Sequence, residues 1–119
     1  SWTVHGSAAP VDLHAVWARD DRDVYAVGDG GTVIHWDGAA WHDLACPLTG
    51  DLLGVQGSAG RYLWVCGRYG ALAVHDGARW RVLSAEHPGD LLDVALLSHR
   101  QAMLLTADGT LQQCKLLDP

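Results

Sequence analysis

The side chains that most often carry catalytic chemistry are few in this chain and far apart in the sequence. Glu86 is the one glutamate, and it stands in a loop beside His87 and Pro88. No nucleophile elbow, phosphate-binding loop or zinc-protease motif occurs. The inner strands of the repeat described below carry mainly Leu, Val and Ala, which leaves no carboxylate pair for acid–base work. We therefore expect a protein that is not an enzyme and uses no cofactor.

The histidines and cysteines form no metal-ligand pattern. The seven histidines are scattered without zinc-like spacing. Residues 20–23 are acidic, but they lack the oxygen-ligand spacing and the glycine of a calcium loop, so we expect a solvated turn. Cys46, Cys66 and Cys114 contain no close pair, which favours free thiols over a zinc ribbon or a disulfide framework. No metal site is predicted.

Aromatic and arginine side chains are better candidates for ligand contact. The chain has six Trp, three Tyr and no Phe. Trp faces can stack on sugars, and the pair Arg68–Tyr69 can combine charge-assisted hydrogen bonds with stacking. Trp2, Trp41 and Trp80, however, are spaced 39 residues apart. Their fixed spacing predicts a structural role, in packing over a neighbouring turn.

The 39-residue spacing runs through the whole chain without insertions, which marks an internal repeat. Equivalent positions are Gly31, Gly70 and Gly109; Asp12, Asp51 and Asp90; Leu13, Leu52 and Leu91; and Val16, Val55 and Val94. We expect the recurring glycines, like the tryptophans, to be structural. The sequence predicts one segment, 1–119, with repeats 2–40, 41–79 and 80–119.

Each repeat predicts four short β-strands. In the first copy, apolar runs at 13–18, 24–27, 32–36 and 41–44 are separated by polar or glycine-rich turns. Four strands of about four to six residues fill such a unit, and no helical period is sustained. Four-stranded sheets repeated at about 40 residues are typical of β-propeller blades. The predicted fold is all-β, with three four-stranded propeller blades per chain.

The residues from Asp23 to Trp41, DVYAVGDGGTVIHWDGAAW, resemble the repeats of bacterial β-propeller proteins. The Asp-Gly-x-x-Trp ending, which recurs at 76–80, is similar to the turn between third and fourth strands in Asp-box and lectin propellers. The third copy departs from this pattern, with Lys115 and Leu116 at the Asp-Gly position. The resemblance implies the fold, whereas propellers host many unrelated functions.

The resemblance also implies a ligand face, which propellers build from the loops joining second to third strands and fourth to first strands. The second-to-third loops contain Arg68, Tyr69, Asp29 and Asp108. Trp17 and Trp36 are further candidates, because their counterparts in the other repeats differ in kind. Residues that do not repeat on a repeating scaffold are better candidates for function. These six side chains form the predicted binding set.

The ends of the chain suggest how a ring would close. Trp2–Val4 stands at an outer-strand position, and the last copy stops before a clear fourth strand, so the N-terminal strand can complete the last blade. Three blades are too few for a ring, since four to eight is usual. An open arc would expose apolar blade faces. We predict a head-to-tail homodimer of six blades with strand exchange. The alternative is a piece of a longer propeller whose other blades lie upstream or on a partner chain.

The charge and hydropathy of the chain argue against some classes of partner. The formal net charge of −6 argues against nucleic acid and anionic membranes. No apolar run approaches the roughly 20 residues that span a bilayer. No basic segment followed by an apolar stretch marks a signal peptide. We expect a soluble, bacterial-type protein without a leader, and the sequence leaves its compartment open.

Two classes of binding module remain. The first is a protein-interaction or scaffold module that self-assembles head to tail. The second is a carbohydrate-binding lectin, because the plan is similar to that of small lectins that assemble six blades from short chains. Fucose-type propeller lectins use an Arg, a Glu and a Trp in each site, and the Glu does not recur here. Divergent loops also favour the first class. A third alternative is a propeller segment whose only activity is self-association.

Overall fold

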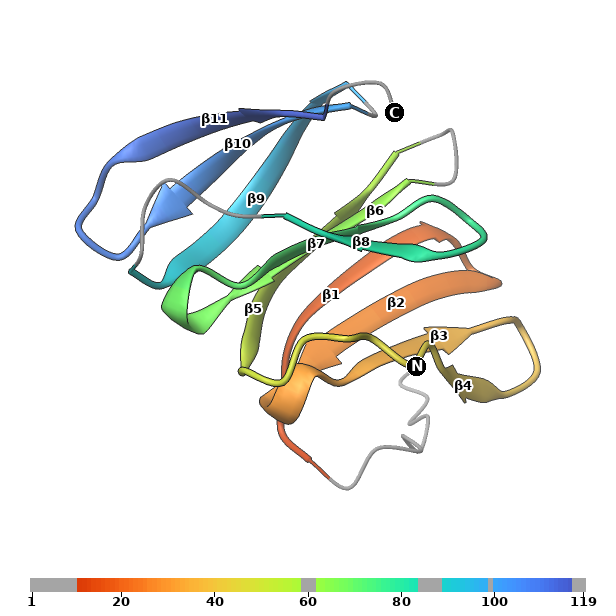
Figure 1. The fold of residues 1–119 in the computed structure, drawn as a ribbon. Helices are drawn as coiled ribbons and strands as arrows, with labels where there is room; N and C mark the ends of the chain where they lie inside the picture. The colour runs from red at the N-terminus through yellow and green to blue at the C-terminus, as the bar shows by residue number, and fades with distance from the viewer. Residues whose placement is uncertain (1–10, 59–61, 84–88, 99, 117–119) are drawn as a thin grey trace, which may run out of the picture.

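The computed structural model describes residues 11–58, 62–83, 89–98 and 100–116, which form three antiparallel sheets in chain order (Figure 1). The first sheet contains β1 (Leu13–Asp20), β2 (Asp23–Gly28), β3 (Val33–Trp36) and β4 (Trp41–Asp43). The second contains β5 (Leu52–Gly57), β6 (Leu63–Gly67), β7 (Leu72–His75) and β8 (Trp80–Val82). The third contains β9 (Leu91–Ser98), β10 (Gln101–Thr106) and β11 (Leu111–Lys115). No helix of the described residues is long and apolar enough to cross a membrane.

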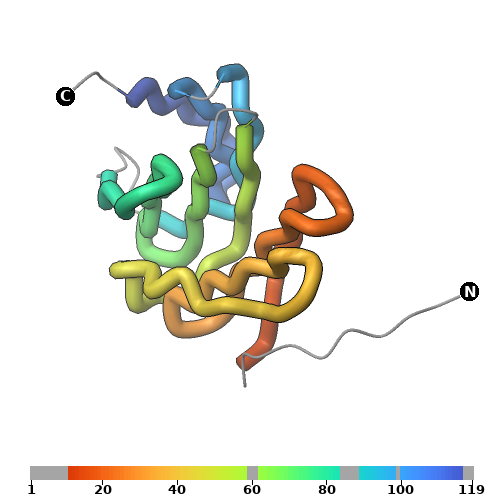
Figure 2. Tube along the Cα trace, turned by 90° about the vertical axis from the view of Figure 1, so that its right-hand side faces the viewer, coloured from red at the N-terminus to blue at the C-terminus, as the bar shows by residue number. Residues whose placement is uncertain are grey.

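The three sheets fan out from a shared inner edge. The first strand of each sheet is innermost, and β5 contacts both β1 and β9. Each sheet then runs outward in sequence order, to β4, β8 and β11. Figure 2 shows the sheets following one another from the red–orange first to the blue third. This is the arrangement of consecutive propeller blades. The strand expected at Trp2–Val4 to complete the third sheet lies outside the described residues.

The turns between second and third strands are single turns of 3-10 helix, η1 (Asp29–Gly31) and η2 (Arg68–Gly70), at the places where the sequence predicts hairpin turns. Gly31 has a φ of 76°, and a Cβ there would lie 1.7 Å from the carbonyl oxygen of Leu48. Glycine is therefore required both by the left-handed backbone and by the close approach of the following loop. Gly70 has a similar φ of 74°.

Two hydrophobic cores fill the spaces between the sheets. Val27, Val33 and Leu52 belong to the core between the first and second sheets. Trp64 and Leu72 belong to the core between the second and third sheets. The alternation of side chains along each strand sends successive residues of the second sheet into different cores. The second sheet is therefore covered on both faces, which explains why its β6 is buried at every position.

Candidate functional site

The turns η1 and η2 lie at the ends of the sheets where β1, β5 and β9 begin (Figure 1). A backbone hydrogen bond ties each turn to the start of its own sheet. The amide of Asp29 donates to the carbonyl of Asp12 at 3.0 Å, and the amide of Arg68 donates to that of Asp51 at 2.9 Å. We call this end, formed by η1, η2, residues 107–110 and the residues that precede β1, β5 and β9, the loop face.

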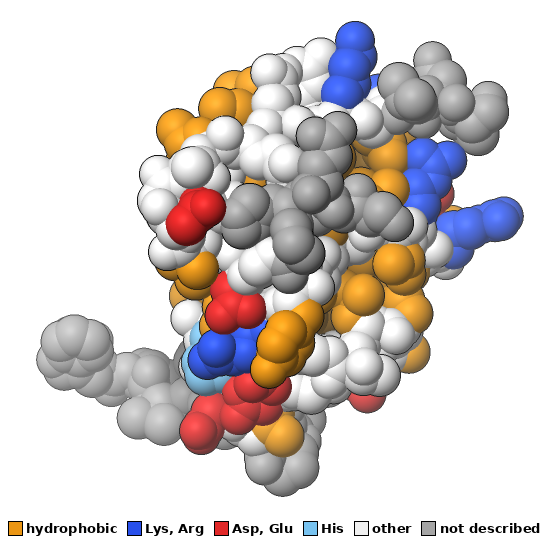
Figure 3. All heavy atoms as spheres, turned by 60° about the vertical axis from the view of Figure 1, so that its left-hand side comes forward, with side chains coloured by type: hydrophobic (Ala, Val, Ile, Leu, Met, Phe, Trp, Pro, Cys, Tyr) orange, Lys and Arg blue, Asp and Glu red, His pale blue; other side chains and the backbone are white. Residues whose placement is uncertain are grey.

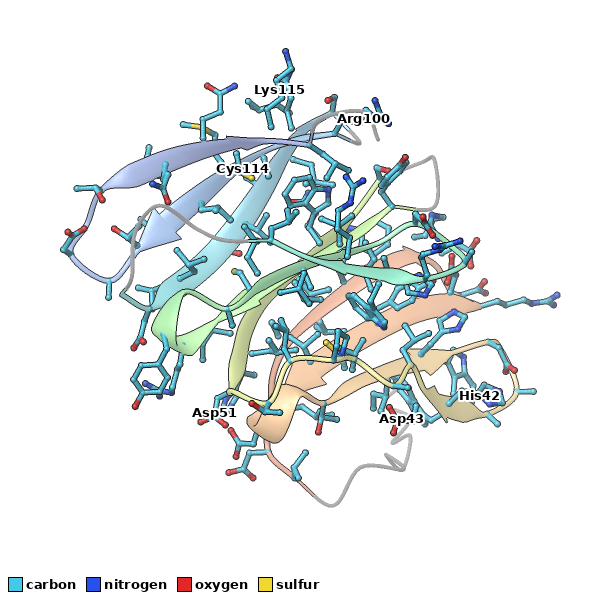
Figure 4. The ribbon with its side chains drawn as sticks, viewed as in Figure 1. His42, Asp43, Asp51, Arg100, Cys114 and Lys115 are labelled. Atoms are coloured by element: carbon cyan, nitrogen blue, oxygen red, sulfur yellow. The ribbon has the colours of Figure 1, made fainter. Side chains whose placement is uncertain are left out.

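Aspartate side chains tie each turn to the next sheet as well. The carboxylate of Asp51 accepts a hydrogen bond from the amide of Gly30 at 3.0 Å. The carboxylate of Asp90 accepts one from the amide of Tyr69 at the same distance. Figure 4 shows Asp51 at this end of the second sheet. Neighbouring sheets are thus connected by repeated carboxylate–amide bonds, which hold the loop face in one conformation and reduce the entropy lost on binding.

Tyr69 stands at the tip of η2 with 84% of its surface exposed. Its φ of 60° lies in the left-handed region, which costs a residue with a Cβ about 1–2 kcal/mol. The first sheet has Gly30 at this place, with a φ of 68°. The second sheet therefore holds an exposed aromatic side chain on strained backbone, and such strain is concentrated at functional sites.

Arg68 lies between two carboxylates that come from successive sheets. Its Nε is 3.4 Å from an oxygen of Asp51, and its Nη1 is 3.3 Å from an oxygen of Asp90. The guanidinium is about half exposed. The two aspartates fix the position of the Arg68 guanidinium. Its exposed N–H groups remain able to donate hydrogen bonds to a ligand.

Asp29 and Asp108, the other two loop candidates, also lie on the loop face. Asp29 is 2.6 Å from the ring nitrogen Nε2 of His14. Asp108 accepts hydrogen bonds from the hydroxyl and the amide of Thr110, at 2.8 and 3.1 Å. The carboxylate of Asp108 thus helps to form its own turn, whereas that of Asp29 connects its turn to β1 of the same sheet. Figure 3 shows acidic, basic and hydrophobic side chains gathered on the lower part of this surface.

The structure places Trp17 and Trp36 away from the loop face. Trp17 lies between the first and second sheets, where its ring fills the space that a Cβ at Gly57 would need. Trp36 packs against Trp41 on the outer face of the first sheet, with ring centroids 5.5 Å apart. These two candidates are not brought together with Arg68 or Tyr69.

A polar cluster between the first and second sheets was not predicted. Asp23 pairs with Arg19 and lies 2.6 Å from the ring nitrogen Nε2 of His35, which stacks on Tyr25 at 4.4 Å. Burial by itself would raise the pKa of Asp23, but hydrogen bonds from Arg19 and His35 outweigh it and lower the pKa. The residues come from three strands, so no sequence spacing signals the cluster.

The described residues form no metal site, and the buried cysteine among them, Cys66, is not a reactive thiol. Among the described residues, no group of three or more His, Cys, Asp or Glu could hold a metal ion. Burial raises the pKa of the Cys66 thiol to about 12, which leaves it protonated at neutral pH.

No protein-family model matches this chain, and no curated protein matches it. Among solved structures, the chain is similar to YCF48, in a structure described as "YCF48 bound to D1 peptide", with a TM-score of 0.75 and 19% sequence identity. The alignment covers 92% of this chain and 38% of the YCF48 chain, so this chain spans well under half of that protein's length. The likeness shows the fold: the three sheets are propeller blades.

Proposed function

We propose that this chain is a non-enzymatic β-propeller module that binds a protein partner through its loop face and associates head to tail with a second copy. The observation that carries the binding role is the exposed, strained Tyr69 beside the fixed guanidinium of Arg68. Tyr and Arg are, with Trp, the residue types enriched at the energetic centres of protein interfaces. The structure of YCF48 with a D1 peptide supports a peptide or protein ligand for this fold.

A sugar ligand has weaker support on the loop face. A lectin built from repeated blades would repeat its contacts, whereas the turn tips here carry Gly30, Tyr69 and Asp108 at equivalent positions. A single aromatic tip between a glycine tip and an aspartate tip fits one partner that spans several blades.

Panning a random peptide display library on the purified chain tests the binding role. We expect enriched peptides that bind the wild type and lose at least about tenfold in affinity on Tyr69→Gly, the loss of one interface anchor. Val82→Ala, at an exposed position of β8, is the control and should bind unchanged. Peptides that bind Tyr69→Gly equally well would overturn the assignment. Specific signal on a glycan array would favour a lectin instead.

The self-association role rests on two exposed faces whose equivalents are buried inside the same chain. Val55 on the second sheet packs against the first sheet and is 7% exposed, whereas the equivalent Val16 is 68% exposed. Leu72 on the second sheet is fully buried, whereas the equivalent Leu111 on the third sheet is 65% exposed. Each end face therefore exposes an apolar residue at a position that is buried in an internal interface of the same chain.

A tryptophan in the first sheet also indicates that a sheet is missing next to the exposed face of the first sheet. The indole of Trp80 donates a hydrogen bond to the carbonyl of Leu44 on the preceding sheet, at 3.0 Å. Trp41 occupies the equivalent position in the first sheet, and its buried indole nitrogen has no acceptor among the described residues. A carbonyl from a preceding blade would satisfy this donor.

Each end face corresponds, by its repeat positions, to one side of an interface between sheets inside the chain. The exposed face of the third sheet is equivalent to the face of the second sheet that contacts the third. The exposed face of the first sheet is equivalent to the face of the second sheet that contacts the first. Stacking one copy on another would therefore place two sheets in the same relation as the neighbouring sheets inside the chain. Two copies would close a ring of six blades, within the usual range.

Light scattering after size exclusion tests this assembly. We expect twice the 12.8 kDa of one chain for the wild type. Val16→Asp and Leu111→Asp, one on each end face, should both give monomers, because each buries a charge in an apolar interface. Val82→Asp is the matched control and should remain dimeric. A monomeric wild type would overturn the proposal and favour blades supplied by a longer or different chain.

A further inference from the structure

The exposed face of the third sheet carries Lys115, the one lysine of the chain. Lys115 on β11 stands opposite Gln101 on β10, and its neighbour Cys114 packs against the core between the second and third sheets. Because successive side chains of a strand point to opposite faces, Lys115 is directed away from the second sheet. Figure 4 shows Lys115 and Cys114 on opposite sides of β11. Lys115 is exposed, and its side chain makes no hydrogen bond or ion pair with the described residues.

The repeat predicts what Lys115 would face in a head-to-tail pair. Two repeats before Lys115 stands Asp37, which lines the groove between the first and second sheets. The opposite wall of that groove includes His75 and Gly77 of the second sheet. In a head-to-tail pair, the third sheet of one copy and the first sheet of the next would take the places of these two sheets. The counterpart of His75 is then Trp36, so Lys115 of one copy would lie near Trp36 of the next.

Trp36 helps to form a pocket with the chemistry of a cation site. This tryptophan pocket has a volume of about 160 Å³ and is lined by Asp21, Val24, Trp36 and Trp41. The two indole rings are inclined at 55°, with centroids 5.5 Å apart. Asp21 stands between β1 and β2, and its carboxylate makes no hydrogen bond or ion pair with the described residues. Indole faces beside a carboxylate attract an ammonium group through the ring quadrupole and through charge.

The two grooves inside the chain do not combine a lysine with an aspartate in this way. The equivalent residues in the other repeats are Asp37 and Asp76 for the lysine, and Gly60 and His99 for the aspartate. The lysine therefore occurs only on the exposed face of the third sheet, and the aspartate only beside the exposed face of the first sheet. The charges that differ from the repeat are complementary between the two end faces.

We propose that the ammonium group of Lys115 docks in the tryptophan pocket of a second copy, beside Asp21, and so fixes the register of head-to-tail association. This inference rests on the self-association proposed above and names the side chains that make it specific. Pairing of two like end faces would bring together two lysines or two aspartates, which disfavours the wrong orientation. In a closed pair, each copy would supply its lysine to the pocket of the other.

Carbodiimide cross-linking tests this contact, because the reagent joins an amine to a carboxylate that touches it. Since the chain has one lysine, a covalent dimer can form only through Lys115 or the N-terminal amine. We expect a dimer on a denaturing gel, with Lys115 joined to Asp21 in the mass spectrum of its peptides. A mixture of isotope-labelled and unlabelled copies shows that the link joins two chains. Lys115→Arg keeps the charge without the reactive amine, so it should remain dimeric in solution and lose this link.

Analytical ultracentrifugation measures how much the contact contributes. Lys115→Gln should raise the dissociation constant of the dimer at least about tenfold, because each of two equivalent interfaces would lose a desolvated cation–π contact. Arg79→Gln removes the same charge from an exposed position before β8 and is the matched control, which should leave the constant unchanged. The thermal midpoint of each variant shows that it is folded.

The outcomes separate this inference from the proposed self-association. Wild-type dimers without the Lys115–Asp21 link, or an unchanged dissociation constant in Lys115→Gln, would overturn the inference and leave the tryptophan pocket to a different occupant, while self-association stands. A link between Lys115 and a carboxylate of its own chain would overturn it as well, as would equal weakening by Arg79→Gln, which would show a general charge effect. A monomeric wild type would overturn self-association itself, and this inference with it.

Discussion

The first and second sheets have nearly the same backbone and very different surroundings. β1 and β5 begin 39 residues apart, and the amides of Gly28 and Gly67 make the same turn hydrogen bond, at 3.0 and 2.9 Å. The second sheet nevertheless packs against neighbours on both faces, whereas the first packs on one. The comparison shows that repeat position determines local conformation, while the number of neighbouring sheets determines burial. The same side chain can therefore be core in one copy and surface in the next.

The largest expected difference is between Val55 and Val16. We expect Val55→Ala to lower the free energy of unfolding by about 2 kcal/mol, because it removes buried methyl groups and leaves a cavity. Val16→Ala should cost less than about 0.5 kcal/mol, as at other exposed positions. Urea unfolding in the Leu111→Asp background, where association should be lost, measures both. An equal loss in the free energy of unfolding for the two variants would show that the face of the first sheet is covered within one chain.

A smaller difference is expected from exchanging the turn tips. Tyr69→Gly should raise the free energy of unfolding by about 0.5–1 kcal/mol, because relief of left-handed strain exceeds the entropy cost of glycine. Gly30→Tyr should lower it by about 1 kcal/mol, although its Cβ would meet no atom within 4 Å. Thermal and urea unfolding of the two variants check this. A destabilised Tyr69→Gly would mean that Tyr69 serves packing, and would weaken its assignment as a binding residue.

The smallest expected difference is in the response to acid. The amides of Ala40 and Ala39, with the imidazole of His42, lower the pKa of Asp37 to about 2. The amides of Arg79 and Ala78 likewise lower the pKa of Asp76.

Because the folded-state pKa is depressed, each carboxylate stabilises the fold above the unfolded value of 3.8, and this contribution is lost as pH falls through the folded pKa. Asp37→Asn should flatten the fall in stability between pH 4 and 2 more than Asp76→Asn does. Urea midpoints across this range measure the two slopes. An equal effect of both substitutions would show that His42 adds nothing to the turn of the first sheet.

The candidate site could be predicted only in part, and the reason is geometric. Arg68 and Tyr69 are adjacent in sequence and occupy a turn, so the repeat register was enough to place them on one face. Trp17 and Trp36 were chosen because they break the repeat, but that criterion does not state which face of a strand they occupy. Trp17 lies between sheets, and Trp36 lies on the outer face of the first sheet.

The groove between the second and third sheets, which Arg79, Arg81 and Arg100 line, shows what sequence comparison lacked. The departures of Arg79 and Arg81 from the repeat were visible in the sequence, yet nothing marked them as neighbours of Arg100. They line one groove only because β8 and the turn after β9 form its opposite walls, between two sheets. Contacts between sheets join residues that no local spacing relates.

The sequence by itself determined the strands, the turns and the position of each within a 39-residue unit, because these depend on local propensity and on alternation of side chains along a strand. The tertiary structure decided which faces are covered and which charges meet. Burial and electrostatics depend on the neighbouring sheet, and the same residue at the same repeat position has a different neighbour in each copy.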